Sequence, residues 1–189
     1  IGGVPLNAVN EENLMQRVVL VRHNSYLFKG TVEENLKMAK PDATKEEMEA
    51  VLQKVNLLGF LQTQDGLQTQ LLEKASNLSG GQCQRLVIAR ALLRTDSAVY
   101  IFDEAASNID VESEELIMNV IHELAKTKTV LLISHRLANV VKSDKIYFLK
   151  DGEIKESGKH DELMSRNGAY RHLYESQMAL ENYGKGGVA

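Results

Sequence analysis

The stretch that decides the fold is Leu78–Arg94, with the sequence LSGGQCQRLVIARALLR. Ser79 is a favoured N-cap residue, and good helix formers with no proline before residue 94 follow it, so the sequence predicts a helix that begins at Gly80 or Gly81. Two glycines in a first helical turn cost roughly 1 kcal/mol each relative to alanine. We therefore expect another group to approach the backbone closely here. A phosphate fits, because unpaired N–H groups and the helix dipole attract anions.

Composition restricts the class of protein. The chain has 189 residues, 43% of them hydrophobic and 25% charged, which is typical of one globular domain, or of a domain with a subdomain. The net charge of −4 does not indicate a polyanion-binding surface, so we expect no nucleic-acid partner. The single cysteine, Cys83, has no possible disulfide partner, which favours a reducing compartment. No apolar run reaches the roughly 18 residues that cross a bilayer, so we expect no membrane insertion.

Continuous apolar runs predict buried strands. Val18–Val21 and Ala98–Phe102 are such runs, and Thr129–Arg136 is expected to contain a further buried strand that ends in His. Strands that are apolar throughout are typical of a parallel sheet covered by helices on both faces. Asp103 and Glu104 follow the second run, where open α/β sheets bind ligands at the carboxyl ends of their strands. The two side chains point to opposite sides of an extended chain, so they can have different roles. As a bare pattern, the aspartate fits equally well as the cap of a following helix.

Five motifs in order resemble those of the ABC transporter ATPases. The loop Arg22–Leu36 is similar to the one after the second core strand of exporter-type members. Leu78–Gln82 resembles the signature motif, and Ala98–Glu104 resembles the Walker B strand. Ser107–Asp110 resembles the D-loop, and Ser134–Arg136 resembles the switch-histidine segment. On this resemblance the chain is identified as part of an exporter-type nucleotide-binding domain, an α/β fold with an incomplete P-loop NTPase-like (RecA-like) parallel sheet and an inserted helical subdomain.

The resemblance implies catalytic and metal-binding residues. Glu104 would orient and deprotonate the attacking water, and His135 would contact the γ-phosphate of ATP. Asp103 would hold Mg²⁺, mostly through water. His23 stands where the family has a glutamine associated with the metal and the water. It would keep a reduced form of that role, or be a polar loop residue only.

A second set of residues would act on ATP held by another subunit. In the family, two nucleotide-binding domains sandwich MgATP between the phosphate loop of one and the signature motif of the other. Asp110 can cap the following helix, and in the family its loop also crosses this dimer interface. The ATP-binding residues implied here are Ser79, Gly80, Gly81, Gln82 and Asp110.

The resemblance also implies a membrane partner. Thr69–Ala75 is similar to the acidic loop with which exporter members contact their transmembrane domain. Glu73 takes the acidic place, and Ala75 stands where glycine is usual. A solvent-facing glutamate in a loop is an equally good interpretation of Glu73. If the family role holds, the chain works at the cytoplasmic face of a membrane.

The motifs predict a division into four parts. Residues 1–31 would form part of the core, residues 32–94 the helical subdomain, residues 95–180 the remainder of the core, and residues 181–189 a tail. Within the third part, Asp151-Gly152 predicts a two-residue hairpin turn, and helices are expected to about Ala179.

One motif of the family is absent from the sequence. No Gly-x-x-x-x-Gly-Lys-Ser/Thr occurs, although the resemblance implies one before Val18. We therefore expect the chain to be the C-terminal two-thirds of a domain and to hydrolyse ATP slowly or not at all alone. In the family, the strand that carries this motif lies between the strand ending at His135 and the strand beginning near Lys145. Its lack would expose strand edges, which predicts self-association or a locally rearranged sheet.

Two alternatives remain at this stage. The chain could be a non-catalytic, degenerate module that offers its signature motif to another subunit's ATP. His23 favours this slightly, whereas Glu104 and His135 argue against it. It could also be the C-terminal half of a chromosome-maintenance or repair ATPase head, which would follow a long coiled coil. The segment Leu27–Thr31 favours the exporters.

Overall fold

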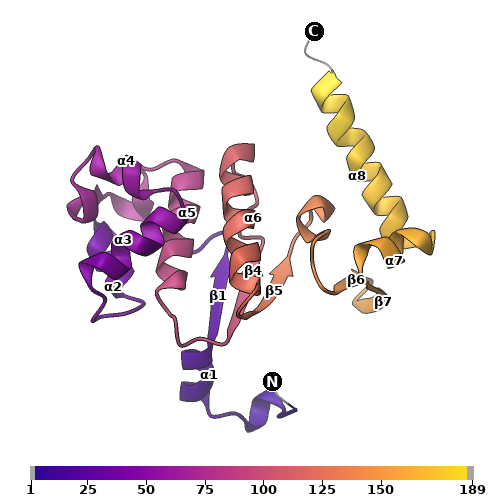
Figure 1. Cartoon of the computed structure of the whole chain (residues 1–189), viewed down its shortest axis with the longest axis horizontal. Helices are drawn as coiled ribbons and strands as arrows, with labels where there is room; N and C mark the ends of the chain where they lie inside the picture. The colour runs from indigo at the N-terminus through magenta and orange to yellow at the C-terminus, as the bar shows by residue number, and fades with distance from the viewer. Residues whose placement is uncertain (1–2, 187–189) are drawn as a thin grey trace. The chain divides into compact units, whose positions relative to one another are not determined.

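The computed structural model describes residues 3–186 of the chain, with the side chains of residues 3–180 (Figure 1). They divide into two compact units, one that ends at Ile133 and one that begins at Ser134. Each unit has its own hydrophobic core. The division that the motifs predict has other boundaries and remains a prediction.

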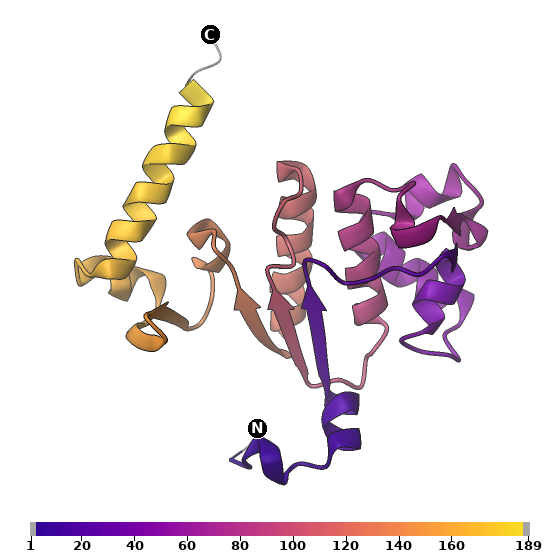
Figure 2. The ribbon, with the colours of Figure 1, turned by 180° about the vertical axis from the view of Figure 1, so that it is seen from behind.

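The first unit is built on a parallel sheet of three strands in the order β1–β4–β5. Val21 lies beside Phe102, and Phe102 lies beside Leu132 in the register. This confirms the predicted parallel core. Because the strands are parallel, their carboxyl ends share one edge of the sheet, as Figure 2 shows. The strands are β1 (Val18–Arg22), β4 (Val99–Asp103) and β5 (Thr129–Ile133).

In the described part of this unit, helices cover only one face of the sheet. The helices α5 (Gly80–Leu92) and α6 (Val111–Ala125) pack on that face (Figures 1 and 2). On the other face, Leu20 and Leu131 are each 49% exposed and Ile133 is 44% exposed. The prediction of strands buried on both faces was therefore wrong. Alternate side chains of a strand point to opposite faces, and only one set meets a helix. That buried set includes Val19, Val21, Tyr100 and Phe102.

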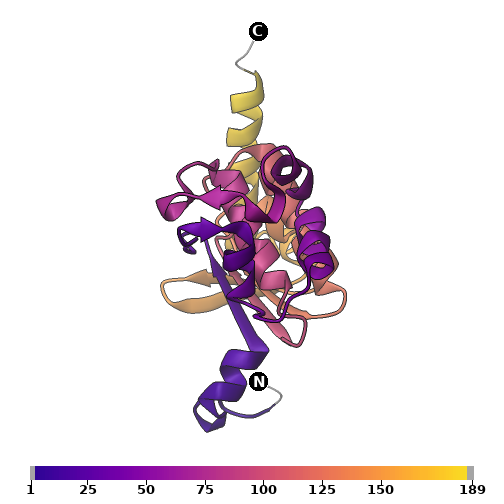
Figure 3. The same cartoon turned by 90° about the vertical axis from the view of Figure 1, so that its left-hand side faces the viewer.

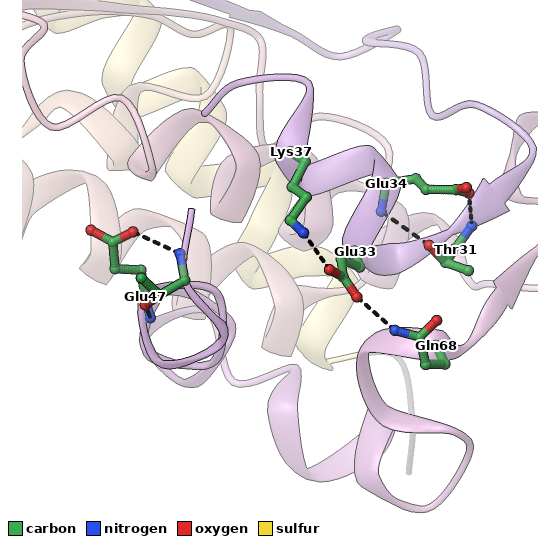
Figure 4. A network of polar contacts seen from close by, with 7 residues as sticks. Thr31, Glu33, Glu34, Lys37, Glu47 and Gln68 are labelled. Carbon is green, nitrogen blue, oxygen red and sulfur yellow. Dashed lines mark hydrogen bonds and ion pairs between the residues drawn. The ribbon is translucent and has the colours of Figure 1, made fainter. Parts of the chain in front are cut away.

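A layer of short helices continues the core beyond α5. Their buried side chains belong to the same hydrophobic cluster as those of β1 and β4, so helical layer and sheet share one core. Capping boxes begin two of these helices at Thr31 and Thr44, as Figure 4 shows for the first. The two capping boxes fix where these helices begin. The helices are α2 (Val32–Lys37), α3 (Lys45–Lys54) and α4 (Leu58–Gln62).

Polar contacts tie α2 to the loop that precedes β3. The Lys37 ammonium and the Gln68 amide both donate to the Glu33 carboxylate, at 2.5 and 2.6 Å (Figure 4). These hydrogen bonds, of which that from Lys37 has the larger effect, lower the pKa of Glu33.

The remaining elements of the first unit are short. Helix α1 (Glu11–Arg17) leads directly into β1 (Figure 3). The others are η1 (Leu6–Ala8), β2 (Gly30–Thr31), η2 (Gly66–Gln68), β3 (Gln70–Leu71) and η3 (Glu73–Ala75).

The second unit consists of a hairpin and two helices around a small core of Leu137, Ile146, Leu163 and Tyr170. The predicted hairpin turn is confirmed. Asp151 and Gly152 have φ values of 54° and 77°, as a type I′ turn requires. The elements are η4 (Leu137–Val140), β6 (Ile146–Lys150), β7 (Glu153–Gly158), α7 (His160–Ser165) and α8 (Ala169–Gly186).

The last helix is longer than predicted. It continues past Ala179 to Gly186, because Leu180 and Glu181 are good helix formers. Of the predicted tail 181–189, residues 187–189 lie outside the described residues. Among the helices that the structure describes, none is long and apolar enough to span a bilayer.

Two neighbouring residues of β1 test the one-sided burial of the sheet. Val21 is buried under the helices, and Leu20 is on the uncovered face. We expect Val21→Ala to lower the free energy of unfolding by about 2 kcal/mol, and Leu20→Ala by less than about 1 kcal/mol, although leucine loses more atoms. Urea unfolding followed by circular dichroism measures both values. Equal losses would mean that both faces are covered.

Candidate functional site

The carboxyl edge of the sheet brings three predicted residues together. The His23 N–H donates to the carbonyl of Asp103 at 3.2 Å, so the loop after β1 is held against the end of β4. The Glu104 N–H donates to the carbonyl of Ile133, the last residue of β5, at 3.0 Å. The proposed metal-binding and catalytic residues of the first unit therefore come from adjacent strand ends.

Glu104 has an unusual backbone conformation. Its φ of 52° lies in the left-handed region, which costs a residue other than glycine on the order of 1–3 kcal/mol. Its carbonyl accepts hydrogen bonds from the Ser107 N–H at 3.0 Å and the Ser107 hydroxyl at 2.9 Å. These bonds hold the turn against the strain. Strain of this kind collects at functional sites, and no local sequence pattern predicted it at Glu104.

Asp103 makes an ion pair with Arg22, whose Nε lies 3.8 Å from its Oδ2. No cluster of three or more His, Cys, Asp or Glu side chains suited to a metal occurs among the described residues. Mg²⁺ usually keeps several waters and binds one or two carboxylates together with substrate phosphates. A single carboxylate such as that of Asp103 can therefore hold Mg²⁺ when waters and phosphates supply the other ligands. Asp103 at a strand end, beside the His23 loop, suits that arrangement.

The signature stretch folds as predicted at its start. Ser79 caps α5, which begins at Gly80, as predicted, and ends at Leu92. The Gln82 N–H donates to the Ser79 hydroxyl at 3.2 Å, and the Ser79 N–H donates to the Gln82 side-chain oxygen at 2.9 Å. The first N–H groups of a helix have no acceptor within the helix, so the exposed start of α5 can receive an anion.

The surroundings of the two glycines in this turn differ. A Cβ on Gly81 would lie 2.2 Å from the Ser113 hydroxyl oxygen and 2.9 Å from Oδ2 of Asp110. The start of α6 therefore approaches the backbone closely at Gly81, and a phosphate contact at this residue stays a prediction. A Cβ on Gly80 would meet only Ile109, at 4.0 Å. Gly80 is thus the position that remains open to a ligand.

Asp110 caps α6, as the sequence allowed. Its carboxylate accepts from the Ser113 N–H at 2.8 Å. This backbone hydrogen bond lowers the pKa of Asp110 below its ordinary value. The close approach of Asp110 to Gly81 packs the D-loop-like segment against the start of the signature-like helix.

Comparison with known proteins agrees with these motifs. A profile of the ABC transporter family matches residues 1–107. An uncharacterised ABC transporter ATP-binding protein of Haemophilus influenzae is 51% identical over 177 residues, which cover 93% of this chain and 31% of that protein. An ATP-dependent lipid A-core flippase of Vibrio vulnificus is 40% identical over 179 residues, with 94% and 30% covered.

The chain belongs to the ABC transporter family. A solved structure of a bacterial Atm1-family ABC exporter with ATP bound matches this ABC transporter chain with a TM-score of 0.86 and 30% identity, covering 94% of this chain and 31% of that one. The predicted fold class is therefore confirmed. The chain spans 30–31% of the length of these relatives.

The switch-like histidine belongs to the second unit of the ABC transporter chain. His135 follows β5 by two residues, its side chain is exposed, and its carbonyl accepts from the Gln177 amide at 2.7 Å. Because the two units are separate bodies, the proximity of His135 to Glu104 stays a prediction.

The acidic loop of the ABC transporter chain also has a strained backbone. Lys74 and Ala75, next to Glu73, have φ values of 56° and 52°. Ala75 is buried, and its carbonyl lies 3.6 Å from Sγ of Cys83, whose thiol pKa is raised by burial. The contact between this loop and α5 lies within the first unit, and Glu73 itself is exposed.

Sequence reasoning missed two residues of this site. Arg22 pairs with Asp103, and the available signal was its place at the end of a strand predicted to lie in a parallel sheet with β4. Ser113 excludes a side chain at Gly81, and its only signal was its position three residues after the predicted cap Asp110.

Substitution of the two glycines separates their roles. We expect Gly81→Ala to lower the free energy of unfolding by about 1–3 kcal/mol, because the new methyl group overlaps Ser113. Gly80→Ala should raise it by about 0.5–1 kcal/mol, because alanine is the better helix former and has room. Urea unfolding measures both. Ser113→Gly should restore part of the loss in Gly81→Ala, and equal effects at both glycines would contradict this packing.

The cap of α6 predicts a pH dependence of stability. The folded-state pKa of Asp110 is below its ordinary value of 3.8, so its ionised carboxylate stabilises the fold above that pH, and this stabilisation is lost as the pH falls through the folded-state value. Asp110→Asn keeps an oxygen acceptor but does not ionise. We expect the advantage of the unchanged chain over Asp110→Asn to shrink between pH 6 and pH 3 in urea unfolding. A constant difference would contradict the assignment.

Proposed function

We propose that this chain forms part of the ATP-hydrolysing domain of an exporter-type ABC transporter, which couples ATP hydrolysis to transport across a membrane. The observation that carries the proposal is Glu104, held by a strained turn next to Asp103 at the carboxyl edge of a parallel sheet. ATP and Mg²⁺ are the proposed cofactors. The ABC exporter relative with the similar fold was solved with ATP bound.

The roles of the edge residues follow from their chemistry. A carboxylate at Glu104 can accept a proton from water as the water attacks the γ-phosphate, and the bonds from Ser107 fix the backbone that carries it. Asp103 would hold Mg²⁺, which neutralises charge on the phosphates when bound. His23 would hydrogen-bond the water or the metal's water shell, and His135 would contact the γ-phosphate.

The start of α5 would face the ATP of a second nucleotide-binding domain. The Ser79 hydroxyl, the first N–H groups of the helix and the exposed Gly80 form a surface suited to a phosphate. Gln82 and Gly81 would fix this surface through the capping box and the contact with α6. Asp110, joined to Gly81, would lie at the same dimer interface.

A transmembrane domain is the other proposed partner, which would place the chain at the cytoplasmic face of a membrane. Exposed Glu73 on its strained loop is one candidate contact. Tyr26 and Phe28 are a second, because both residues are exposed and their rings lie edge to face with centroids 4.8 Å apart. Exposed aromatic rings of this kind are favoured at protein interfaces.

A non-catalytic partner module is the second candidate function. The observation that favours it is His23 in place of the family's glutamine. In that case α5 would still complete another subunit's ATP site, and Glu104 would have no role in turnover. The chromosome-maintenance alternative is not favoured, because the relatives described above are transporters.

Two variants in the assembled transporter that contains this chain distinguish these functions. If the chain is catalytic, Glu104→Gln should lower ATP hydrolysis at its site by about a hundredfold or more while ATP still binds, because the general base is lost. Gly80→Asp should also abolish turnover, because it places a carboxylate where the γ-phosphate would arrive. It should still fold, since acids favour a helix start and Gly80 has room.

Each outcome has a separate meaning. If Gly80→Asp lowers ATP hydrolysis and Glu104→Gln leaves it unchanged, the chain is the non-catalytic module. If neither variant changes hydrolysis, the proposed function is wrong. Leu20→Ala is the matched control, because that exposed residue lies in the same sheet but away from its carboxyl edge.

A further inference from the structure

Arg22 and Asp103 are the last residues of neighbouring parallel strands and lie side by side in the register. Both belong to the set of alternate residues that points to the uncovered face of the sheet, with Leu20 and Ile101. The Arg22 Nε lies 3.8 Å from the Asp103 Oδ2. The guanidinium is therefore next to the carboxylate to which the proposed function assigns Mg²⁺.

Three hydrogen bonds hold the backbone of Arg22 in place. Its N–H donates to the Ser25 hydroxyl at 3.0 Å, and its carbonyl accepts from the Ser25 N–H at 3.2 Å and from the buried Gln84 amide at 3.3 Å. The side chain itself is 58% exposed. Arg22 thus has a backbone fixed beside Asp103 and a side chain that is more than half exposed to solvent.

We propose that Arg22 is a positioning residue of the metal site, an internal cation that pairs with the Asp103 carboxylate before Mg²⁺ binds and competes with Mg²⁺ for it. Mg²⁺ binding then requires the guanidinium to leave Asp103. This inference rests on the proposed function, because it takes Asp103 as a metal ligand.

The charge of Arg22 and the exposure of the pair determine how its removal changes the affinity for the metal. A guanidinium and a divalent cation at one carboxylate repel each other, so removing the guanidinium raises the affinity for the metal. Both side chains are partly exposed, Asp103 to 37%, so water and salt screen the interaction. We expect a rise of roughly threefold to tenfold in metal affinity at low ionic strength. An exposed ion pair adds little to folding, so Arg22→Gln should remain folded.

Mn²⁺, the paramagnetic substitute for Mg²⁺, tests the proposal without any activity measurement. Electron paramagnetic resonance of free Mn²⁺ gives the metal affinity of the full chain at low salt. The chain has 26 acidic residues that bind Mn²⁺ weakly, so each affinity is compared with that of the same protein carrying Asp103→Asn. We expect Arg22→Gln to raise the Asp103-dependent affinity threefold to tenfold, and less at high salt.

Arg17→Gln is the matched control. It removes the same charge one residue before the opposite end of β1, and Arg17 is also exposed. It should leave the Asp103-dependent affinity unchanged. An equal rise in both variants would show a general charge effect and overturn the proposal.

The remaining outcomes are distinct. If Asp103→Asn lowers Mn²⁺ binding but Arg22→Gln does not raise it, the role of Arg22 is wrong and the metal role of Asp103 stands. If Asp103→Asn has no effect in any background, both fail. If Arg22→Gln instead weakens binding of ATP with Mn²⁺, Arg22 holds phosphate, and the competition proposed here is overturned.

Discussion

The parallel pairing of β1, β4 and β5 is the constraint on which the candidate site depends. Parallel strands end at a common edge, so residues far apart in the sequence meet there without any further device. His23 is bonded to Asp103, and Glu104 is bonded to Ile133, by the same kind of backbone contact that pairs the strands. An antiparallel pairing of the same strands would separate these residues to opposite edges.

The hydrophobic core then connects this edge to the helical layer. Leu86 and Ile88 of α5 are fully buried in the same cluster as Val21, Phe102 and the inner side chains of α2 and α3. The start of α5 is therefore carried by a packed helix and not by a loose loop. A surface that must meet a ligand in a fixed orientation benefits from this support, because packed side chains have few alternative arrangements.

Local signals explain what the sequence could predict. The side chains of Thr44, Ser79 and Asp110 each accept from the N–H three residues further on, so these caps can be predicted without tertiary structure. The hairpin at Asp151 is equally local. The apolar runs predicted the strands, but a run of apolar residues does not say whether both faces meet a helix, and Leu131 is exposed.

What the sequence could not predict depends on contacts between distant segments. The left-handed turn at Glu104 arises where β4 meets the end of β5 and the Ser107 turn. The ion pair at Arg22 requires the register of two strands. The close fit of Gly81 against Ser113, on another helix, depends on how α5 packs against α6, which the local pattern does not contain.

That same contact has a mechanical consequence. With no side chain at Gly81, the tip of α5 lies directly against the first turn of α6, and the two helices also pack along the sheet. The two helices are therefore in direct contact at this point. A displacement that tilts α5 should therefore move Asp110 with it, because the contact at Gly81 resists bending between the two helices.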